Sequence, residues 1–291
     1  MTNRVETPIF IISVGRSGST FFHRLLCRHA NVAWLSLLSE TFPGRPNLNR
    51  LWLRTVDLPL IGDRLQNLIK PAECYNFWEH YCRGFRCPCR DLLPQDVTHK
   101  KKEDIQTVMT RTLTSTRHRL IVKITGWPRM SFLKEIFPDA KFIHILRDGR
   151  AVANSFINVP FWRGWQGPEN WRWGPLTPSQ QEQWERFDKS FLALAGIQWN
   201  IFMHAIDEAK RFVEEQNFFE LKYETLCRDP VGTLNEVIAF CNLNWSSRFG
   251  RIVQNHPTNN TNYKWHEQLT LDQQEIIEKV THDYLEKYGY I

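Results

Sequence analysis

Residues 9–29 carry the pattern that most restricts the fold, because a buried strand, a glycine loop and a helix follow one another directly. Ile9-Phe-Ile-Ile-Ser-Val14 is an unbroken run of mainly β-branched and aromatic residues. Such a run is typical of a strand buried on both faces of a parallel sheet. Gly15-Arg-Ser-Gly18 follows as a loop. Residues 19–28 then place apolar side chains at helical spacing, at Phe21, Phe22, Leu25 and Leu26.

Three later segments also have the composition of buried strands: residues 120–125, 141–146 and 218–223. Helical patterns separate or follow them, at residues 103–117, 130–137, 151–156, 178–216, 230–241 and 272–288. Strands that alternate with helices favour right-handed βαβ units and a parallel sheet. We therefore predict an α/β fold with three layers, P-loop-like, in which a central and mainly parallel sheet is flanked by helices.

Composition and length limit the class of protein. The chain has 291 residues, is 42% hydrophobic and contains 12 Trp, so it has enough apolar material for a core and is not disordered. We expect a single domain over residues 1–291, with a Cys-, Trp- and Pro-rich insertion at about 41–100 and a long aromatic loop at about 160–176. The net charge of +6 is too small for a dedicated nucleic-acid binder but is compatible with a pocket for a small polyanion.

The sequence also predicts where the protein resides. A transmembrane helix needs about 20 apolar residues in a row, and no run in this chain approaches that length. Residues 1–7 are polar and do not resemble a secretory signal. We therefore expect a cytoplasmic protein without a transmembrane segment. The oligomeric state stays open.

Seven cysteines leave a question about metal binding. Cys27, Cys227 and Cys241 lie in apolar or mixed segments and have the pattern of ordinary buried thiols. The other four cluster with a C-x₇-C-x₄-C-x-C spacing, which differs from the C-x₂₋₄-C pairs of zinc sites. No metal is predicted, although metal binding, disulfide formation and free thiols all stay open for Cys74, Cys82, Cys87 and Cys89.

The loop at residues 15–20 predicts an anion site. Backbone N–H groups before a helix, together with the helix dipole, favour a phosphate. The loop resembles a Walker A motif, yet Ser19 stands where that motif has its lysine. The strand at 141–146 is followed by Arg147 rather than by a magnesium-binding Asp. These differences disfavour a P-loop kinase or NTPase, which remains an alternative.

Four motifs follow one another along the chain: Val14–Thr20, residues 142–155, residues 221–230 and Tyr263-Lys-Trp265. In this order they resemble the motifs of sulfotransferases that use 3′-phosphoadenosine-5′-phosphosulfate (PAPS), and most of all those of the tyrosylprotein-sulfotransferase-like branch. The loop Val14-Gly-Arg-Ser-Gly-Ser-Thr20 is similar to the family's 5′-phosphosulfate loop. The segment 142–155 looks like its 3′-phosphate motif, with Ser155 eight residues after Arg147. Residues 221–230 resemble its Y-E-D-L-x-x-D-P segment, and Tyr263-Lys-Trp265 resembles its K-W signature.

The resemblance implies PAPS as sulfuryl donor and a set of residues that hold it. The phosphosulfate would lie on the loop, and the 3′-phosphate on Arg147 and Ser155. Tyr223 would lie near the nucleotide, and Lys264, in a closing loop at 259–264, would reach a phosphate. The loop residues implied are Gly15, Arg16, Ser17, Gly18, Ser19 and Thr20.

Catalytic candidates follow from the chemistry of in-line sulfuryl transfer, in which negative charge grows on the leaving oxygen. Arg16 and Lys123 are the candidate cations; Lys123 lies within a buried strand, 24 residues before Arg147. Glu40, which resembles the family's E-E-T-R element, is the candidate general base. His23, His144 and Glu73 are fallback bases, of which His144 has the pattern of a packed core residue.

The acceptor is expected to present a hydroxyl, or an amine, on a small molecule, glycan, lipid or peptide. Residues 41–100 and 160–176 should form the walls of its site, and the second segment holds Trp162, Trp165, Trp171 and Trp173. These tryptophans could contact the acceptor or only fix the loop to the core. Besides a kinase, the alternative is a non-catalytic nucleotide or glycan binder on the same fold.

Overall fold

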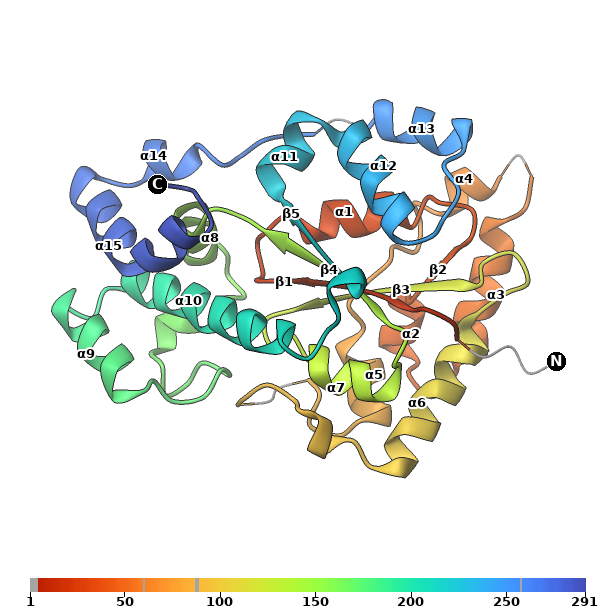
Figure 1. Cartoon of the computed structure of the whole chain (residues 1–291), viewed down its shortest axis with the longest axis horizontal. Coiled ribbons are helices and arrows are strands. Elements are labelled where there is room, and N and C mark those ends of the chain that lie inside the picture. Colours follow the sequence, from red (N-terminus) through yellow and green to blue (C-terminus); the bar gives the residue numbers. More distant parts are fainter. Residues whose placement is uncertain (1–4, 60, 87–88, 257) are drawn as a thin grey trace.

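A five-stranded parallel sheet forms the centre of the computed structural model, which describes residues 5–59, 61–86, 89–256 and 258–291. The strand order is β2-β3-β1-β4-β5, and every neighbouring pair is parallel. This arrangement confirms the prediction of an α/β fold with a parallel sheet between helices (Figure 1). The strands are β1 (Ile9–Ser13), β2 (Val32–Trp34), β3 (Arg119–Thr125), β4 (Lys141–Leu146) and β5 (Phe218–Lys222).

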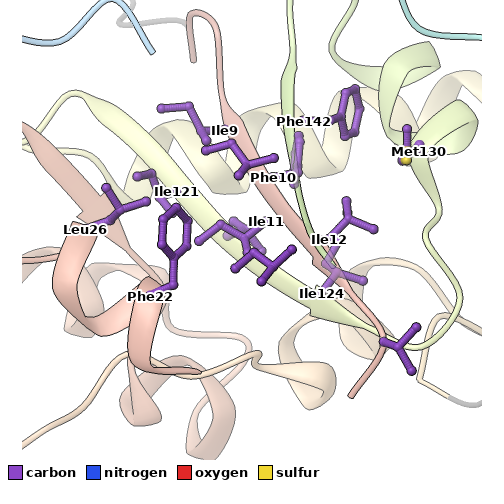
Figure 2. Close-up of a cluster of buried hydrophobic side chains, with 14 of the residues drawn as sticks. Ile9, Phe10, Ile11, Ile12, Phe22, Leu26, Ile121, Ile124, Met130 and Phe142 are labelled. Atoms are coloured by element: carbon purple, nitrogen blue, oxygen red, sulfur yellow. The ribbon is translucent and has the colours of Figure 1, made fainter. Parts of the chain in front are cut away.

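The first strand lies in the middle of the core because both of its faces are apolar. All five residues of β1 are buried. Side chains alternate between the two faces of a strand, and Figure 2 shows Phe22 and Leu26 of the first helix on one side of β1 and Phe142 and Met130 on the other. The ring of Phe10 stacks on that of Phe142 with 5.7 Å between centroids. The strand therefore anchors the loop that follows it to the buried core.

Helices cover both faces of the sheet and the ends of its strands (Figure 1). Between β2 and β3, and again after β5, most of the regular secondary structure is helical. The helices are α1 (Ser19–Leu26), α2 (Leu37–Thr41), α3 (Pro46–Val56), α4 (Gly62–Leu65), α5 (Tyr75–Tyr81), α6 (His99–Thr112), α7 (Met130–Ile136), α8 (Gly149–Ile157), α9 (Pro178–Arg186), α10 (Phe191–Lys210), α11 (Tyr223–Arg228), α12 (Pro230–Phe240), α13 (Ser247–Gln254), α14 (Lys264–Gln268) and α15 (Leu271–Lys287).

The single helix predicted over residues 178–216 is wrong, because the structure has two helices there. Helix α9 ends at Arg186 and α10 begins at Phe191. Between them Asp188 and Lys189 adopt left-handed backbone angles, with φ of 51° and 54°. Ser190 then caps α10, since its hydroxyl accepts a hydrogen bond from the N–H of Ala193. The helix predicted at 103–117 is likewise displaced, to His99–Thr112.

In the part of the chain that the structure describes, no helix is both long enough and apolar enough to cross a bilayer.

Candidate active site

The glycine loop between β1 and α1 presents free backbone donors. Gly18 adopts a left-handed conformation with φ of 79°, and no side chain caps the helix that starts after it. The N–H groups of residues 17–20 have no acceptor among the described residues. A Cβ on Gly18 would lie 2.4 Å from the ring of Tyr223. Uncapped donors at a helix N-terminus that carries no acidic residue suit an anion.

Arg16 connects this loop to helix α8. Its Nε donates a hydrogen bond of 2.9 Å to the Oγ of Ser155, 139 residues away in the chain. Its guanidinium also lies 5.9 Å from the centre of the Phe161 ring. Arg16 itself has a left-handed backbone, with φ of 72°. The predicted phosphosulfate loop and the predicted 3′-phosphate serine are thus in direct contact.

Arg147 brings together the remaining nucleotide candidates. Its Nη1 donates to the carbonyl of Arg16 at 2.8 Å, and its guanidinium lies 4.5 Å from the centre of the Tyr223 ring. Its other nitrogens donate to Thr261 Oγ1 and Asn262 Oδ1, both at 3.1 Å. Burial lowers the pKa of the Arg147 guanidinium. Sequence reasoning missed Thr261 and Asn262, although it placed the closing loop around them.

Lys264 is not part of this cluster. It is exposed at the start of α14, and its ammonium has no hydrogen bond or ion pair with any residue in the described ranges. Tyr223, by contrast, reaches the closing loop, because its hydroxyl donates to the carbonyl of Asn259 at 2.8 Å. The loop at 258–263 is therefore held over Arg147 and Tyr223, with Lys264 outside it.

Lys123 points from the middle of β3 toward the glycine loop. It is only 5% exposed, and its Nζ donates to Thr20 Oγ1 at 2.7 Å. The same ammonium forms an ion pair of 2.8 Å with Glu73 Oε1. The other carboxylate oxygen of Glu73 accepts a hydrogen bond from Thr125 Oγ1 at 3.0 Å. A buried cation is therefore held between the loop and a carboxylate.

Two carboxylates, Glu40 and Glu73, line the same cavity as Lys123. Glu40 lies on α2 and is half-buried. Its Oε2 accepts the backbone N–H of Asn76 at 2.9 Å, which fixes its orientation and leaves its second oxygen available. Either carboxylate could accept a proton from an acceptor hydroxyl in this cavity.

The two histidine fallbacks lie in the core. His144 is fully buried in β4, and its Nδ1 is 2.8 Å from Glu220 Oε2. His23 is buried on α1, where desolvation, assisted by the charges of Lys123 and Arg24, lowers its pKa to about 3. Neither histidine lines the cavity. Their positions do not support a role as base.

The cavity has a volume of about 380 Å³, and both predicted walls contribute to it. Of the four loop tryptophans, only Trp162 and Trp173 line it. Trp171 packs with Trp184 in a separate small core, and Trp165 is exposed. Several other residues that line the cavity were not predicted individually from the sequence: Tyr75, Arg86, Arg129, Arg163, Arg172, Gln198 and Phe202.

The cysteine cluster supplies no metal site within the described residues. Cys74 and Cys82 are buried, Cys89 is exposed, and all three are free thiols. Cys87 lies outside the described residues. The Sγ of Cys74 donates to the carbonyl of Ser36 at 3.2 Å. Across the described ranges, no group of three or more His, Cys, Asp or Glu side chains is arranged to hold a metal ion.

Comparison with known proteins gives relatives of one kind. Omega-hydroxy-beta-dihydromenaquinone-9 sulfotransferase Stf3 of Mycobacterium bovis is 27% identical over 165 residues, which are 56% of this chain and 38% of the relative. Protein-tyrosine sulfotransferase A of Caenorhabditis elegans is 25% identical over 117 residues, 40% of this chain and 25% of that protein. The chain thus aligns with well under half the length of the curated relatives that it matches.

Comparison with solved structures and with family models also finds sulfotransferases. The crystal structure of sulfotransferase STF9 from Mycobacterium avium shares the fold, with a TM-score of 0.62 at 17% identity over 97% of this chain and 77% of that one. A family model, described as the sulfotransferase family, matches residues 8–247. That match covers the glycine loop, Lys123, Arg147 and Tyr223. Since it spans most of the sequence, the chain belongs to the sulfotransferase family.

Proposed function

We propose that this protein transfers the sulfuryl group of PAPS to a hydroxyl, or an amine, of an acceptor. The observation that carries the proposal is the contact of Arg16 with Ser155 and Arg147, which joins two groups of anion-binding donors. PAPS has a phosphosulfate at its 5′ end and a phosphate at its 3′ end, so it requires two such groups side by side. Family membership supports the same activity.

The residues present fit this donor. The free N–H groups of residues 17–20 and the hydroxyls of Ser17, Ser19 and Thr20 would hold the phosphosulfate, with Gly15 and Gly18 allowing the close approach. Arg147 and Ser155 would hold the 3′-phosphate, since a guanidinium pairs bidentately with phosphate. In that case Arg147 exchanges its bonds to Thr261 and Asn262 for the phosphate, and Tyr223 borders the nucleotide. Lys264 would need the closing loop to rearrange.

The chain's own residues would assist the transfer in two ways. Arg16 and Lys123 stabilise the charge that develops on the leaving oxygen, because cations in a desolvated site lower such a barrier. Lys123 is suited to this role since it is buried and already bonded to Thr20 of the loop. Glu40 accepts the proton of the acceptor hydroxyl, with its orientation fixed by the N–H of Asn76.

The proposal specifies the acceptor less closely than the sulfuryl donor. The two curated relatives are named for a hydroxylated menaquinone and for protein tyrosine, both of which present a hydroxyl. We propose a hydroxyl-bearing acceptor held by walls from the 41–100 insertion and the 160–176 loop, on a single domain. A cytoplasmic location stays a prediction.

The proposal is tested by nucleotide binding and by transfer. The product analogue 3′,5′-ADP should raise the melting temperature, whereas ATP with Mg²⁺ should not, and the reverse result would favour the kinase alternative. Transfer from ³⁵S-labelled PAPS should then be screened over phenols, sugars, lipids and tyrosine peptides. Glu40→Ala should abolish the labelled product, and activity unchanged by this substitution would remove Glu40 from the role of base. A wild type that binds 3′,5′-ADP but transfers no label to any acceptor would favour the non-catalytic alternative.

A further inference from the structure

The cavity beside the glycine loop has an excess of positive charge. Its lining includes six cationic side chains but only two carboxylates, Glu40 and Glu73. Glu73 is already paired with Lys123. The phosphosulfate of the proposed donor would bring one charge on its phosphate and one on its sulfate. Two positive charges of the lining therefore remain for another ligand. The six cations are Arg16, Arg86, Lys123, Arg129, Arg163 and Arg172.

Four of these arginines come from segments that take no part in the glycine loop. Arg163 and Arg172 lie on the aromatic loop, Arg86 follows α5, and Arg129 precedes α7. None of the four forms an ion pair with a carboxylate of a described residue, at the distances typical of salt bridges. Exposed arginines elsewhere in the chain are often paired, as Arg186 is with Glu182.

Arg129 is the most constrained of the four. It is 1% exposed, and its Nη atoms donate to the carbonyls of Trp127 and Phe85 at 2.6 and 2.7 Å. Its guanidinium lies 4.4 Å from the centre of the Phe85 ring. Its Nε is buried and has no partner. A buried donor without an acceptor is costly, so a ligand that supplies one is favoured at this position.

The rest of the lining suits an aromatic ring more than a sugar. Trp173 and Phe202 meet edge to face, with 4.9 Å between their centroids, and Arg172 lies 5.7 Å from the Trp173 ring. The amide oxygen of Gln198 is already engaged, since it accepts from Trp162 Nε1 at 2.8 Å, which leaves only the amide nitrogen for a ligand. A sugar needs many polar partners, whereas a phenyl ring needs flat apolar walls. The cavity of about 380 Å³ also borders the glycine loop, where the phosphosulfate would lie, so the space that remains suits a ligand of a single ring.

We propose that the acceptor is a small phenol that also carries an anionic group, a carboxylate or a phosphate-like group. The ring lies against the aromatic walls, the hydroxyl faces Glu40, and the anionic group pairs with the arginines of the aromatic loop and with Arg129. This inference rests on the proposed function, because it identifies the acceptor of the same site.

The test compares two ligands that differ in charge and hardly in shape. Binding of 4-hydroxyphenylacetate and of its neutral amide, 4-hydroxyphenylacetamide, is measured by calorimetry with 3′,5′-ADP present. Sulfation of both is then followed with labelled PAPS. We expect the carboxylate to bind at least about tenfold more tightly and to have the higher kcat/KM, as a charged hydrogen bond would provide. A phosphonate analogue distinguishes a carboxylate site from a phosphate-like one.

A double variant, Arg163→Gln with Arg172→Gln, should remove most of this preference and leave binding of the amide unchanged. The matched control is Arg186→Gln with Arg211→Gln, which removes the same charge from exposed positions outside the cavity. The inference would be overturned by any of three results: equal binding of the two ligands, binding of neither ligand, or a preference for the carboxylate that persists in the double variant. If the amide is sulfated without any preference, the proposed function stands and only the inference fails. Absence of both 3′,5′-ADP binding and sulfation would instead refute the proposed function.

Discussion

At the scale of single residues, Arg147 should decide nucleotide affinity. Its guanidinium connects the glycine loop, Tyr223 and the closing loop. We expect Arg147→Ala to weaken binding of 3′,5′-ADP by roughly 1.5–3 kcal/mol, about ten- to a hundredfold, since charged hydrogen bonds are lost. Calorimetry on the wild type, this variant and the exposed control Arg186→Ala measures the effect. Wild-type affinity in Arg147→Ala would remove this residue from the site.

Glu40 and Glu73 compete for the role of base, and their contacts separate them. Both carboxylate oxygens of Glu73 are engaged, by Lys123 and by Thr125, whereas the carboxylate of Glu40 accepts a hydrogen bond only from the N–H of Asn76 among the described residues. We therefore expect Glu40→Gln to lower kcat by about 10²–10⁴ without changing 3′,5′-ADP affinity. Glu73→Gln should change kcat less, while altering donor binding through Lys123. A larger loss of kcat in Glu73→Gln would move the assignment to Glu73.

Sequence reasoning could identify these residues but not all of their partners. Lys123 stands out because a lysine inside a buried strand is rare. Its partner Glu73 carried little signal, since a carboxylate in a loop is usually solvated. The bond from Arg16 to Ser155 joins positions 139 residues apart, so it depends on the register of β1 and β4 in the sheet. Contacts of this kind follow from topology and are not encoded in local patterns.

At the scale of the strand–loop–helix element, Gly18 is predicted to be irreplaceable. Gly18 and Gly84 both have positive φ, at 79° and 90°. A Cβ on Gly18 would lie 2.4 Å from the Tyr223 ring, whereas one on Gly84 would have no atom within 4 Å. Each alanine variant should lose about 1 kcal/mol of stability from the backbone alone. Gly18→Ala should in addition displace Tyr223 and weaken 3′,5′-ADP binding, which urea unfolding and calorimetry would detect. Equal effects of the two substitutions would contradict this account.

Elements were predictable where burial is continuous and less so where the backbone makes an unusual turn. The strands at 9–13 and 141–146 follow from apolar runs. The break between α9 and α10 depends on left-handed conformations at Asp188 and Lys189, which have no glycine to signal them. Helical periodicity continues across that break, so the pattern indicated one helix.

At the scale of the whole molecule, the parallel sheet and the two segments that wall the cavity were predictable, but most of the side chains that line the cavity were not. Alternation of strands and helices implies parallel pairing, and all four pairings are parallel. The cavity, however, collects side chains from the glycine loop, α2, β3, the aromatic loop and α10. Its arginines come from segments without secondary-structure signals. These arginines gather around one cavity because of the tertiary fold, which local sequence patterns do not indicate.

The buried His23 gives the whole molecule a pH-dependent stability. Its pKa is lowered to about 3 in the folded state by burial and by Lys123 and Arg24, whereas an unfolded histidine titrates near 6.5. Between about pH 6.5 and pH 3, His23 is therefore protonated in the unfolded state but neutral in the folded state. Because the unfolded state binds the extra proton, the free energy of unfolding falls as the pH falls through this range. Between pH 7 and pH 5 this histidine should remove about 2 kcal/mol of stability.

Substitution of His23 should flatten that dependence. Urea unfolding at pH 7 and pH 5 measures the difference for the wild type, for His23→Gln and for His118→Gln, whose histidine is exposed. Because a glutamine at position 23 also changes packing, the comparison uses the change between the two pH values and not the stability at either one. We expect the change to shrink by about 2 kcal/mol in His23→Gln and to stay at the wild-type value in His118→Gln. An unaltered change in His23→Gln would mean that His23 accepts a proton in the folded protein, and that the space between α1 and Lys123 is open to water.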